Sequence, residues 1–451
     1  MKPRTNQQIR RTATNKSILE YVKNITDQMD SEEPFYVFDM SDIVHKYKMW
    51  KYKMPRVRPF YAVKCNDNPL LLELLAVLGL NFDCANKKEI QSVLGIGVDA
   101  SRIIYGNPCK TRSFIKHAAA VGIDLLTFDN ESELYKIKAL HPAAQLVLRI
   151  YVENSGFVCQ LGTKFGCDPK SAEHLLYVAQ ELGLDVVGVS FHVGSNCMDK
   201  TKYGKAIQCA RQVFDRAISM NFNMTLLDIG GGFPGSAEEN VDFDEIACVV
   251  NEALEEYFPL DVGVDVIAEP GRYFTTSAFS LCANIIAKRE AVAPHDGDPL
   301  ITYYLNDGVY GSFSCLMFDQ AEIKPLHLMD SADYAEVCCS LWGPTCDKLD
   351  QIVKKCSLPV LTVGDWLMFE NMGAYNMTLA SNFDNFQKLS VKTILSIGTC
   401  EFLRELPGWW HLAQALEANI EHVQVEKDGK LHDALNFNVL QQFSVKDLVT
   451  A

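Results

Sequence analysis

The sequence predicts an α/β fold in which a (β/α)8 barrel is joined to a second, mainly β domain. Eight short apolar runs of strand character alternate with helix-like stretches between Pro59 and Arg272. After Phe274 this rhythm fades, and strand-like runs separated by turn residues replace it. The 451 residues also exceed the ~250–300 residues at which one hydrophobic core stops growing, so two domains are expected.

The barrel strands are expected in eight runs that precede helix-like stretches. These runs are FYAVKC, NFDCA, RIIYGN, DLLTFD, QLVLRI, VVGVSFHV, LLDIGGG and VIAEPGR. The intervening stretches have apolar positions at a period of 3.6 residues, and several end near a glycine. An open doubly wound sheet would also alternate strands and helices. Eight such units, followed by a region of strand-like runs only, favour a closed barrel instead. We expect this barrel to span residues 41–276.

The N-terminal run PFYVFDM is expected to be a strand that leads into an amphipathic helix with Ile43, Val44 and Tyr47 on one face. A lone strand ahead of a barrel must pair elsewhere. We expect it to join the second domain, formed by residues 1–40 and 277–451. Strands of that domain are predicted in LCANIIAK, ITYYLND, EVCCSLWG, PVLTVGDWLMF and LSVKTILSI.

Composition excludes several classes of protein. A net charge of −15 argues against binding to nucleic acid or to an anionic membrane, because both require basic surfaces. No run approaches the ~20 apolar residues of a membrane span, and the N-terminus lacks the apolar core of a signal peptide, so a cytoplasmic protein is expected. The 15 cysteines are scattered and show no repeated C-x-x-C spacing, so we expect free thiols and no metal.

The candidate active site lies at the carboxyl ends of the barrel strands. The residues of chemical interest at or just after these ends are Lys64, Asp83, Glu89, Arg149, His192, Ser195, Gly230, Gly231, Gly232, Glu269, Gly271 and Arg272. Glycines after the seventh strand and a Gly-Arg pair after the eighth match the place where barrels commonly bind a phosphate through backbone N–H groups and a guanidinium.

A lysine, a phosphate cradle and a carboxylate together meet the needs of pyridoxal 5'-phosphate. Lys64 would form the Schiff base, and Glu269 would pair with the pyridine nitrogen. A protonated ring is an electron sink, so this pairing favours chemistry that leaves a carbanion at the substrate Cα. His192 could lie flat on the ring, and its alternative interpretation is a hydrogen-bonded core histidine.

Motifs along the chain, in matching order, resemble the eukaryotic ornithine decarboxylase family. They are PFYAVKCN, FDCANKKE, SFHVGSNC, LDIGGGFPG, AEPGRYF, LNDGVYGSF, GPTCDKLD and GDWLMFENMGAY. The likeness runs from about Phe35 to about Gln387. It implies a pyridoxal phosphate barrel of the alanine-racemase type, decarboxylation of ornithine to putrescine for polyamine synthesis, and a head-to-tail homodimer with shared active sites.

The resemblance also implies a role for each matching residue. Lys64 is the Schiff-base lysine, Glu269 the pyridinium partner and His192 the stacking residue. The implied phosphate ligands are Ser195, Gly232, Gly271, Arg272 and Tyr375, and the supporting residues around the lysine and cofactor are Asp83, Glu89 and Arg149. Cys346 resembles the acid that reprotonates Cα from the partner subunit. The implied substrate residues are Asp319, Asp347, Tyr310 and Phe383, the two acids holding a distal ammonium.

Departures from the family pattern surround the substrate pocket. Asp319 is flanked by Phe318 and Gln320 rather than Tyr and His, Ser314 stands where the family has asparagine, Asn196 replaces a glycine, and Phe157 is bulky. The same reaction on another amino acid, such as leucine or lysine, is therefore an alternative. A non-catalytic antizyme-binding regulator is a second alternative, although it has no need of Lys64 or Cys346.

A locally basic stretch bears on the antizyme question. Lys110, Lys116, Lys136 and Lys138 lie where the resembled family meets antizyme. The alternative is a solvated helix face with no partner.

Overall fold

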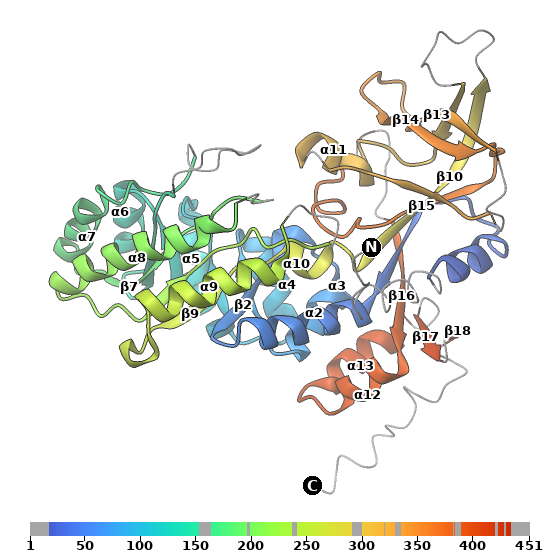
Figure 1. The fold of residues 1–451 in the computed structure, drawn as a ribbon. Helices are drawn as coiled ribbons and strands as arrows, with labels where there is room; N and C mark the ends of the chain where they lie inside the picture. The colour runs from blue at the N-terminus through green and yellow to red at the C-terminus, as the bar shows by residue number, and fades with distance from the viewer. Residues whose placement is uncertain are drawn as a thin grey trace, which may run out of the picture. The chain divides into compact units, whose positions relative to one another are not determined.

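The computed structural model describes residues 18–152, 164–195, 199–236, 241–290, 300–319, 321–329, 335–381, 383, 389–419, 423–427 and 430–433. The chain divides into two compact units, His45–Thr275 and Met1–Val44 with Thr276–Ala451. None of the helices within the described ranges is long and apolar enough to cross a bilayer. Figure 1 shows the order of the elements.

Within the described residues of the first unit, eight parallel strands close into a barrel (Figure 1). The strands are β2 (Val57–Ala62), β3 (Asn81–Cys84), β4 (Ile103–Tyr105), β5 (Leu125–Phe128), β6 (Gln145–Arg149), β7 (Asp185–Ser190), β8 (Leu226–Asp228) and β9 (Asp265–Ala268). The barrel closes where Val57 of β2 pairs with Val266 of β9. The predicted barrel is confirmed.

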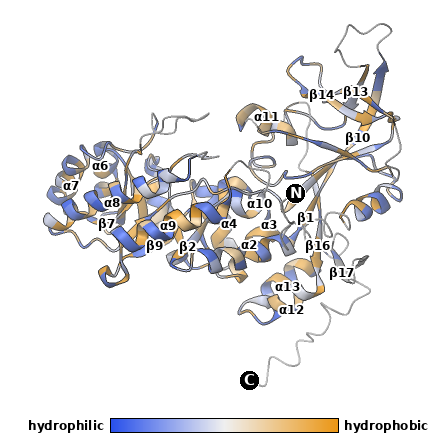
Figure 2. Ribbon diagram, in the orientation of Figure 1, coloured by the Kyte–Doolittle hydropathy of each residue, from blue (hydrophilic) through white to orange (hydrophobic). Residues whose placement is uncertain are grey.

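Helices follow the barrel strands. They are α3 (Pro69–Val77), α4 (Lys87–Gly95), α5 (Arg112–Ala120), α6 (Glu131–Leu140), α7 (Ala172–Glu181), α8 (Thr201–Ser219), α9 (Phe243–Tyr257) and α10 (Arg272–Thr275). Figure 2 shows apolar and polar residues side by side on outer helices such as α8 and α9, as expected of helices with one buried face. Short 3-10 turns lie at Ala100–Arg102 and Leu260–Val262.

Local sequence signals set the ends of these helices. Asn68, Asn86 and Asn130 each accept a hydrogen bond from a backbone N–H of the first turn of α3, α4 and α6. Gly79 and Gly97 follow α3 and α4 with φ of 81° and 82°, a left-handed conformation that side chains disfavour. The asparagine caps therefore fix where α3, α4 and α6 begin, and the glycines fix where α3 and α4 end.

The interior of the barrel is apolar and is filled from several strands. Phe60, Ile104, Val147, Leu226 and Ile267 form one buried cluster, contributed by β2, β4, β6, β8 and β9. This packing fills the barrel below its carboxyl-end mouth, so the mouth is left for polar side chains.

The first strand ends earlier than the sequence suggests. FYAVKC was expected to remain a strand through Lys64, but β2 ends at Ala62, and Val63–Cys65 form a 3-10 turn. The Tyr61 hydroxyl donates to the Asn66 carbonyl at 2.9 Å, and Asn66 Oδ1 accepts from the Asn68 N–H at 3.0 Å. These bonds close the turn that presents Lys64.

The second unit is built around a mixed sheet of ten strands within the described residues, with the main order β14-β13-β11-β10-β1-β16-β17-β18. The strands are β1 (Phe35–Asp39), β10 (Phe279–Glu290), β11 (Ile301–Leu305), β12 (Pro325–His327), β13 (Glu336–Trp342), β14 (Gln351–Pro359), β15 (Trp366–Phe369), β16 (Ser390–Ser396), β17 (Val423–Lys427) and β18 (Lys430–Asp433). β1 lies between β10 and β16, so the N-terminal strand pairs as expected.

Helices complete this unit. They are α11 (Cys315–Phe318), α12 (Ile397–Arg404) and α13 (Trp409–Glu417), with a 3-10 turn at Ser312–Ser314. α2 (Met40–Lys53) follows β1 and runs into the barrel unit. Ile18, Tyr21 and Val22 pack against Phe35 and Trp366 in the core of the sheet.

One predicted strand is divided in two. The sequence predicts one strand in PVLTVGDWLMF, but β14 ends at Pro359 and β15 begins at Trp366. Asp365 Oδ2 accepts from the Thr362 N–H at 2.7 Å, and Gly364 has a φ of 96°. This turn separates the two strands.

Candidate active site

Lys64 lies just beyond β2, and its ammonium contacts Asp83 of the neighbouring strand β3. Lys64 Nζ donates to Asp83 Oδ2 at 2.7 Å, with the Lys64 side chain 42% exposed and the Asp83 side chain fully buried. The other Asp83 oxygen, Oδ1, has no hydrogen-bond partner among the described residues. The amine is therefore positioned by a buried carboxylate, and the Lys64 side chain is partly exposed.

Two more carboxyl groups lie at this end of the barrel. Asp228 is the last residue of β8, and Glu269 directly follows β9. Asp228 Oδ1 accepts from the Gly230 N–H at 2.8 Å. Burial raises the pKa of Asp228 to about 7. Burial also raises the pKa of Glu269 well above its usual value, and the charges of Asp228 and Asp83 add to the increase. Burial therefore shifts both the Asp228 and the Glu269 carboxyl groups toward their protonated forms.

His192 follows β7 and is held in the neutral form. The Gly194 N–H donates to His192 Nδ1 at 2.9 Å, so the neutral ring carries its proton on Nε2. The ring keeps some exposure to solvent, but burial among protein atoms lowers its pKa to about 3, assisted by the positive charges of Arg149 and Lys64. His192 thus offers an uncharged aromatic face.

The glycine-rich segment after β8 is fixed by close contacts that side chains would prevent. Gly230 and Gly232 have φ of 65° and 102°, and a Cβ on Gly232 would lie 2.4 Å from the Gly194 carbonyl oxygen. A Cβ on Gly231 would lie 2.6 Å from the Glu269 carbonyl oxygen and 3.2 Å from His192 Nε2. These three residues must therefore be glycine to keep the present backbone path.

Side chains behind this segment fix its backbone. Tyr203 Oη donates to the Gly231 carbonyl at 3.0 Å, and Lys46 Nζ donates to the Gly235 carbonyl at 2.6 Å. Phe233 packs against the rings of Trp50 and Tyr203, with centroid distances of 4.9 and 5.1 Å. These contacts support the backbone of the glycine-rich segment.

The remaining barrel candidates also lie at or near this end of the barrel. Glu89 caps the start of α4 and accepts from the Ala85 N–H at 2.7 Å, while burial raises its pKa. Arg149 ends β6, Ser195 follows the His192 segment, and Arg272 opens α10. Gly271 lies against the turn of Lys64, since a Cβ there would meet Cys65 Cβ at 2.8 Å.

The predicted substrate residues belong to the second unit, and three of them contact one another. Tyr310 Oη donates to Asp347 Oδ2, and the Tyr310 and Phe383 rings lie 4.5 Å apart. Cys346 is exposed beside Asp347, and Asp319 follows α11. Tyr375 has a φ of 57°, a strained conformation that in proteins is concentrated at functional sites. Their placement relative to Lys64 remains a prediction.

The loop that carries Cys346 and Asp347 is tied down by Asp350, which is fully buried. Asp350 Oδ1 accepts from the Val309 N–H at 2.8 Å, and Oδ2 accepts from the Thr345 hydroxyl at 2.7 Å. Asp350 therefore links this loop to the segment that carries Tyr310.

A family model described as "Pyridoxal-dependent decarboxylase, pyridoxal binding domain" matches residues 40–276. The chain belongs to this family. Within it, the decarboxylase is 48% identical to the ornithine decarboxylase of Mus musculus over 402 residues, 87% of each chain. It is 49% identical to antizyme inhibitor 2 of Xenopus laevis over 383 residues, 83% of this chain and 84% of the other.

A solved structure shares the fold of the decarboxylase. The arginine decarboxylase of Paramecium bursaria Chlorella virus superposes with a TM-score of 0.78 and 36% identity, covering 83% of this chain and all of the other. The likeness extends over both units, because 83% of the chain exceeds the share of either unit alone.

The barrel residues of the decarboxylase fit pyridoxal phosphate. Asp83 Oδ1 and Asp228 Oδ2 are buried acceptors without a hydrogen-bond partner among the described residues, and the Glu269 carboxyl group lies beside them. A protonated pyridine nitrogen is the kind of cation that such a cluster favours. The glycine-rich loop supplies the backbone cradle that a phosphate requires.

Sequence reasoning missed Asp228 and Asp350. Asp228 reads as part of the strand LLDIGGG, and only its contact with Glu269 gives it a role. Asp350 is the last residue of the GPTCDKLD motif. Its position five residues after Thr345 could have indicated that its carboxylate binds back to this loop. Phe157, Asn196 and Gln320, three of the departures noted in the sequence, lie outside the described residues.

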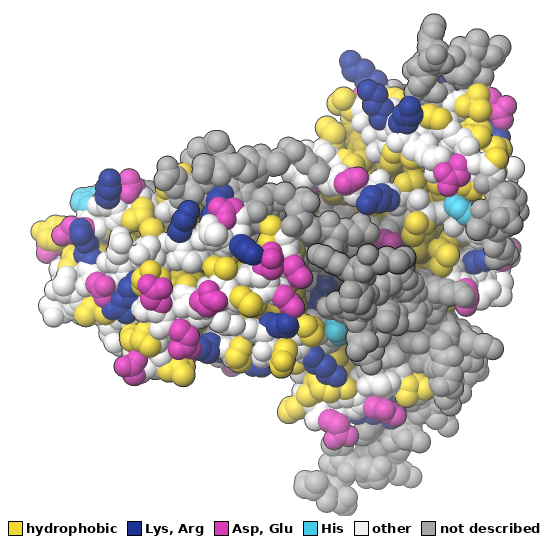
Figure 3. Space-filling view, in the orientation of Figure 1, with side chains coloured by type: hydrophobic (Ala, Val, Ile, Leu, Met, Phe, Trp, Pro, Cys, Tyr) yellow, Lys and Arg dark blue, Asp and Glu magenta, His cyan; other side chains and the backbone are white. Residues whose placement is uncertain are grey.

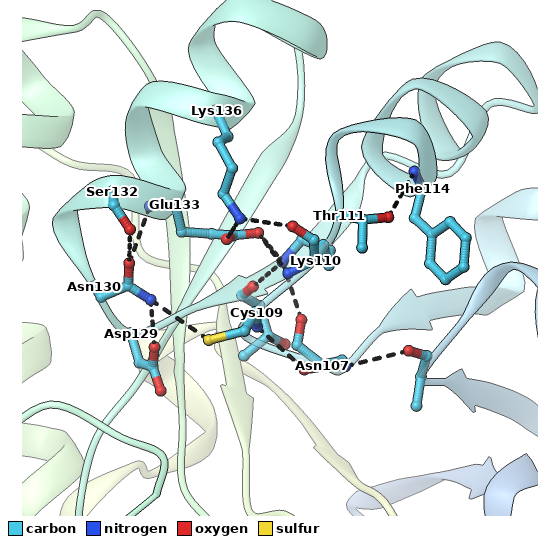
Figure 4. Close-up of polar contacts among 12 residues, drawn as sticks. Asn107, Cys109, Lys110, Thr111, Phe114, Asp129, Asn130, Ser132, Glu133 and Lys136 are labelled. Carbon is cyan, nitrogen blue, oxygen red and sulfur yellow. Dashed lines mark hydrogen bonds and ion pairs between the residues drawn. The ribbon is translucent and has the colours of Figure 1, made fainter.

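The basic stretch is only partly a surface. Figure 4 shows Lys110 and Lys136 converging on Glu133. The Lys110 side chain is fully buried, with Nζ 3.0 Å from Glu133 Oε1 and 2.6 Å from the Thr127 carbonyl oxygen. Both interpretations from sequence, a binding surface and a solvated helix face, are therefore wrong for Lys110.

The exposed members of that stretch are Lys116 and Lys138. On the face drawn in Figure 3, Lys and Arg side chains are interspersed with Asp and Glu. That face offers no broad field of positive charge to an acidic partner.

Replacing Asp228 with asparagine should flatten the pH dependence of stability in the cofactor-free protein. Because the pKa of Asp228 is raised to about 7, its stabilising contribution is present at acidic pH and is lost as pH rises through about 7. The wild-type unfolding temperature should fall between about pH 5 and pH 8 more than that of Asp228→Asn. Asp185→Asn, at an exposed position of β7, is the matched control. Parallel curves for wild type and Asp228→Asn would contradict this account.

Proposed function

We propose that this decarboxylase converts ornithine to putrescine and carbon dioxide. The proposal rests chiefly on the retention of Asp319 and Asp347 together with 48% identity to an ornithine decarboxylase. Two carboxylates in a substrate pocket favour a substrate with a distal ammonium and disfavour substrates that would leave the acids unpaired.

Asp347 is prepared to receive a cation. Its hydrogen bond from Tyr310 lowers the pKa of Asp347, assisted by the Leu349 N–H, so the carboxylate is ionised at neutral pH. Tyr310 and Phe383 would flank the aliphatic part of the substrate with apolar surface. Asp319 is proposed as the second ligand of the ammonium.

The barrel residues would hold the cofactor and control protons around it. Pyridoxal phosphate, when bound, supplies the electron sink that accepts the electron pair of the breaking Cα–carboxylate bond. Lys64, oriented by Asp83, would hold the cofactor covalently, and Glu269 with Asp228 would keep a proton at the pyridine nitrogen. His192 would contribute a neutral aromatic surface beside the ring. The phosphate would lie on the backbone of Gly230–Gly232, with Ser195, Gly271, Arg272 and Tyr375.

Cys346 is the proposed acid that returns a proton to Cα after carbon dioxide leaves. Cys346 is exposed on a loop that Asp350 holds in place. Such a position suits a side chain that would reach into the active site of the partner subunit. The proposed enzyme is a cytoplasmic homodimer in which each site combines Lys64 of one subunit with Cys346 and Asp347 of the other.

Two alternatives are tested by the same experiment. The viral relative named an arginine decarboxylase shows that this fold serves other amino acids, so leucine and lysine remain candidate substrates. The relative named antizyme inhibitor 2 supports a non-catalytic regulator that binds antizyme. Retention of Lys64, His192, Glu269 and Cys346 favours the enzyme.

Purified protein should show the visible absorbance of lysine-bound pyridoxal phosphate and should release carbon dioxide from ornithine in preference to lysine, arginine and leucine. Lys64→Ala should lose the absorbance, whereas Lys87→Ala, on the first turn of α4, should retain it. Turnover of leucine with ornithine inert would overturn the assignment of the two acids. Absence of both absorbance and carbon dioxide would favour the antizyme-binding alternative.

Mixing two inactive variants should restore part of the activity. Lys64→Ala and Cys346→Ala each lack one half of the proposed shared site, so a heterodimer contains one site with both groups intact. About one quarter of wild-type activity is expected after random subunit exchange, and it should be measured as putrescine formed. If subunits exchange but no activity returns, the two residues do not serve one shared site.

A further inference from the structure

Two thiols outside the proposed catalytic machinery lie in contact on neighbouring strands. Cys339 of β13 and Cys356 of β14 have their sulfur atoms 3.4 Å apart. Cys339 is fully buried, and Cys356 is partly exposed. None of the roles proposed for the reaction uses either residue.

The strand register explains why these side chains meet. β13 and β14 are antiparallel, and Cys339 is the direct partner of Cys356 in their pairing. Directly opposed residues of an antiparallel pair have Cα atoms about 4.5–5.5 Å apart, which falls in the range that a disulfide spans. The adjacent Cys338 is paired instead with Ser357, and successive side chains of a strand point to opposite faces.

The two thiols differ in environment. Cys356 is partly exposed to solvent whereas Cys339 is buried, and the hydrogen bond between the two sulfur atoms, in which either thiol can donate, lowers the pKa of the Cys356 thiol. Thiolates, not thiols, react with oxidants, and reaction requires access. Cys356 therefore has the character of an attacking thiol, with Cys339 in place to resolve the product.

We propose that Cys339 and Cys356 form an oxidation site that a peroxide converts to an intramolecular disulfide. The Cys356 thiolate attacks one oxygen of hydrogen peroxide, the O–O bond breaks, and a sulfenic acid forms as hydroxide leaves and takes up a proton. The Cys339 sulfur then attacks the sulfenic sulfur, losing its proton as a second water leaves. Two thiols are oxidised by two electrons, and one peroxide is reduced to two waters.

The disulfide would close the hairpin that carries the Cys346 loop. β13 leads into this loop and β14 leaves it, with Asp350 holding its end. A cross-link across the strands restricts the unfolded chain and tethers the base of the hairpin, so the oxidised protein should be the more stable form.

The test uses the full-length protein, freed of reductant, treated with hydrogen peroxide, alkylated and digested. Mass spectrometry should find a peptide pair joined through Cys339 and Cys356, lighter by two hydrogen atoms than the two thiol peptides and separated by dithiothreitol. The unfolding temperature should rise on oxidation and return on reduction. Cys356→Ser should lose both effects, and Cys338→Ser should keep both.

Other oxidation products would overturn the proposal. Recovery of Cys339 and Cys356 as alkylated thiols while Cys346 is oxidised would show that the pair does not react. A cross-link that persists in Cys356→Ser would assign the chemistry to other cysteines. Cys339→Ser serves as a second variant, and circular dichroism of each variant verifies that a lost cross-link does not result from a lost fold.

Discussion

The candidate active site depends on three carboxyl groups at the carboxyl ends of barrel strands. Asp83 belongs to β3, Asp228 ends β8, and Glu269 follows β9. Burial, and then the negative charge of Asp83, raises the pKa of Asp228 and of Glu269, and the positive charge of Arg149 acts in the opposite direction on both. Such a group is costly to bury unless a cation or a proton is present. A protonated pyridine nitrogen placed beside these carboxyl groups would be favoured for the same reason. A protonated ring is the electron sink that decarboxylation requires, so the burial of these carboxyl groups would support that chemistry.

The rest of the barrel serves to hold these groups in place. β2, β3, β8 and β9 bring residues far apart in sequence to one end, and the 3-10 turn after β2 presents Lys64 above Asp83. The glycine-rich loop is fixed by Tyr203 and Lys46 from behind. Neutral His192 adds surface without adding charge. The second unit contributes a separate group, Tyr310, Asp347 and Phe383, whose chemistry suits an ammonium.

Much of this could be predicted from sequence because barrel strands and helices repeat with distinct apolar periods. Lys64, Glu269 and the glycines stood out because they end strand-like runs. Asp228 was missed because its raised pKa results from burial, and then from the nearby charge of Asp83, which the folded chain alone creates. The prediction for Lys110 was wrong for the same reason, since Lys110 lies in a loop and its buried partner Glu133 belongs to α6. The end of β2 and the division between β14 and β15 depend on side-chain hydrogen bonds that apolar patterns do not encode.

The most direct test of this account is the protonation state of the cofactor ring. Protein loaded with pyridoxal phosphate labelled with ¹⁵N in the ring should show, by nuclear magnetic resonance, the chemical shift of a protonated pyridine nitrogen at neutral pH. Glu269→Gln should move that shift to the unprotonated value while the absorbance of lysine-bound cofactor remains. An unprotonated ring nitrogen in the wild-type protein would contradict the claim that the carboxylate group exists to hold this proton.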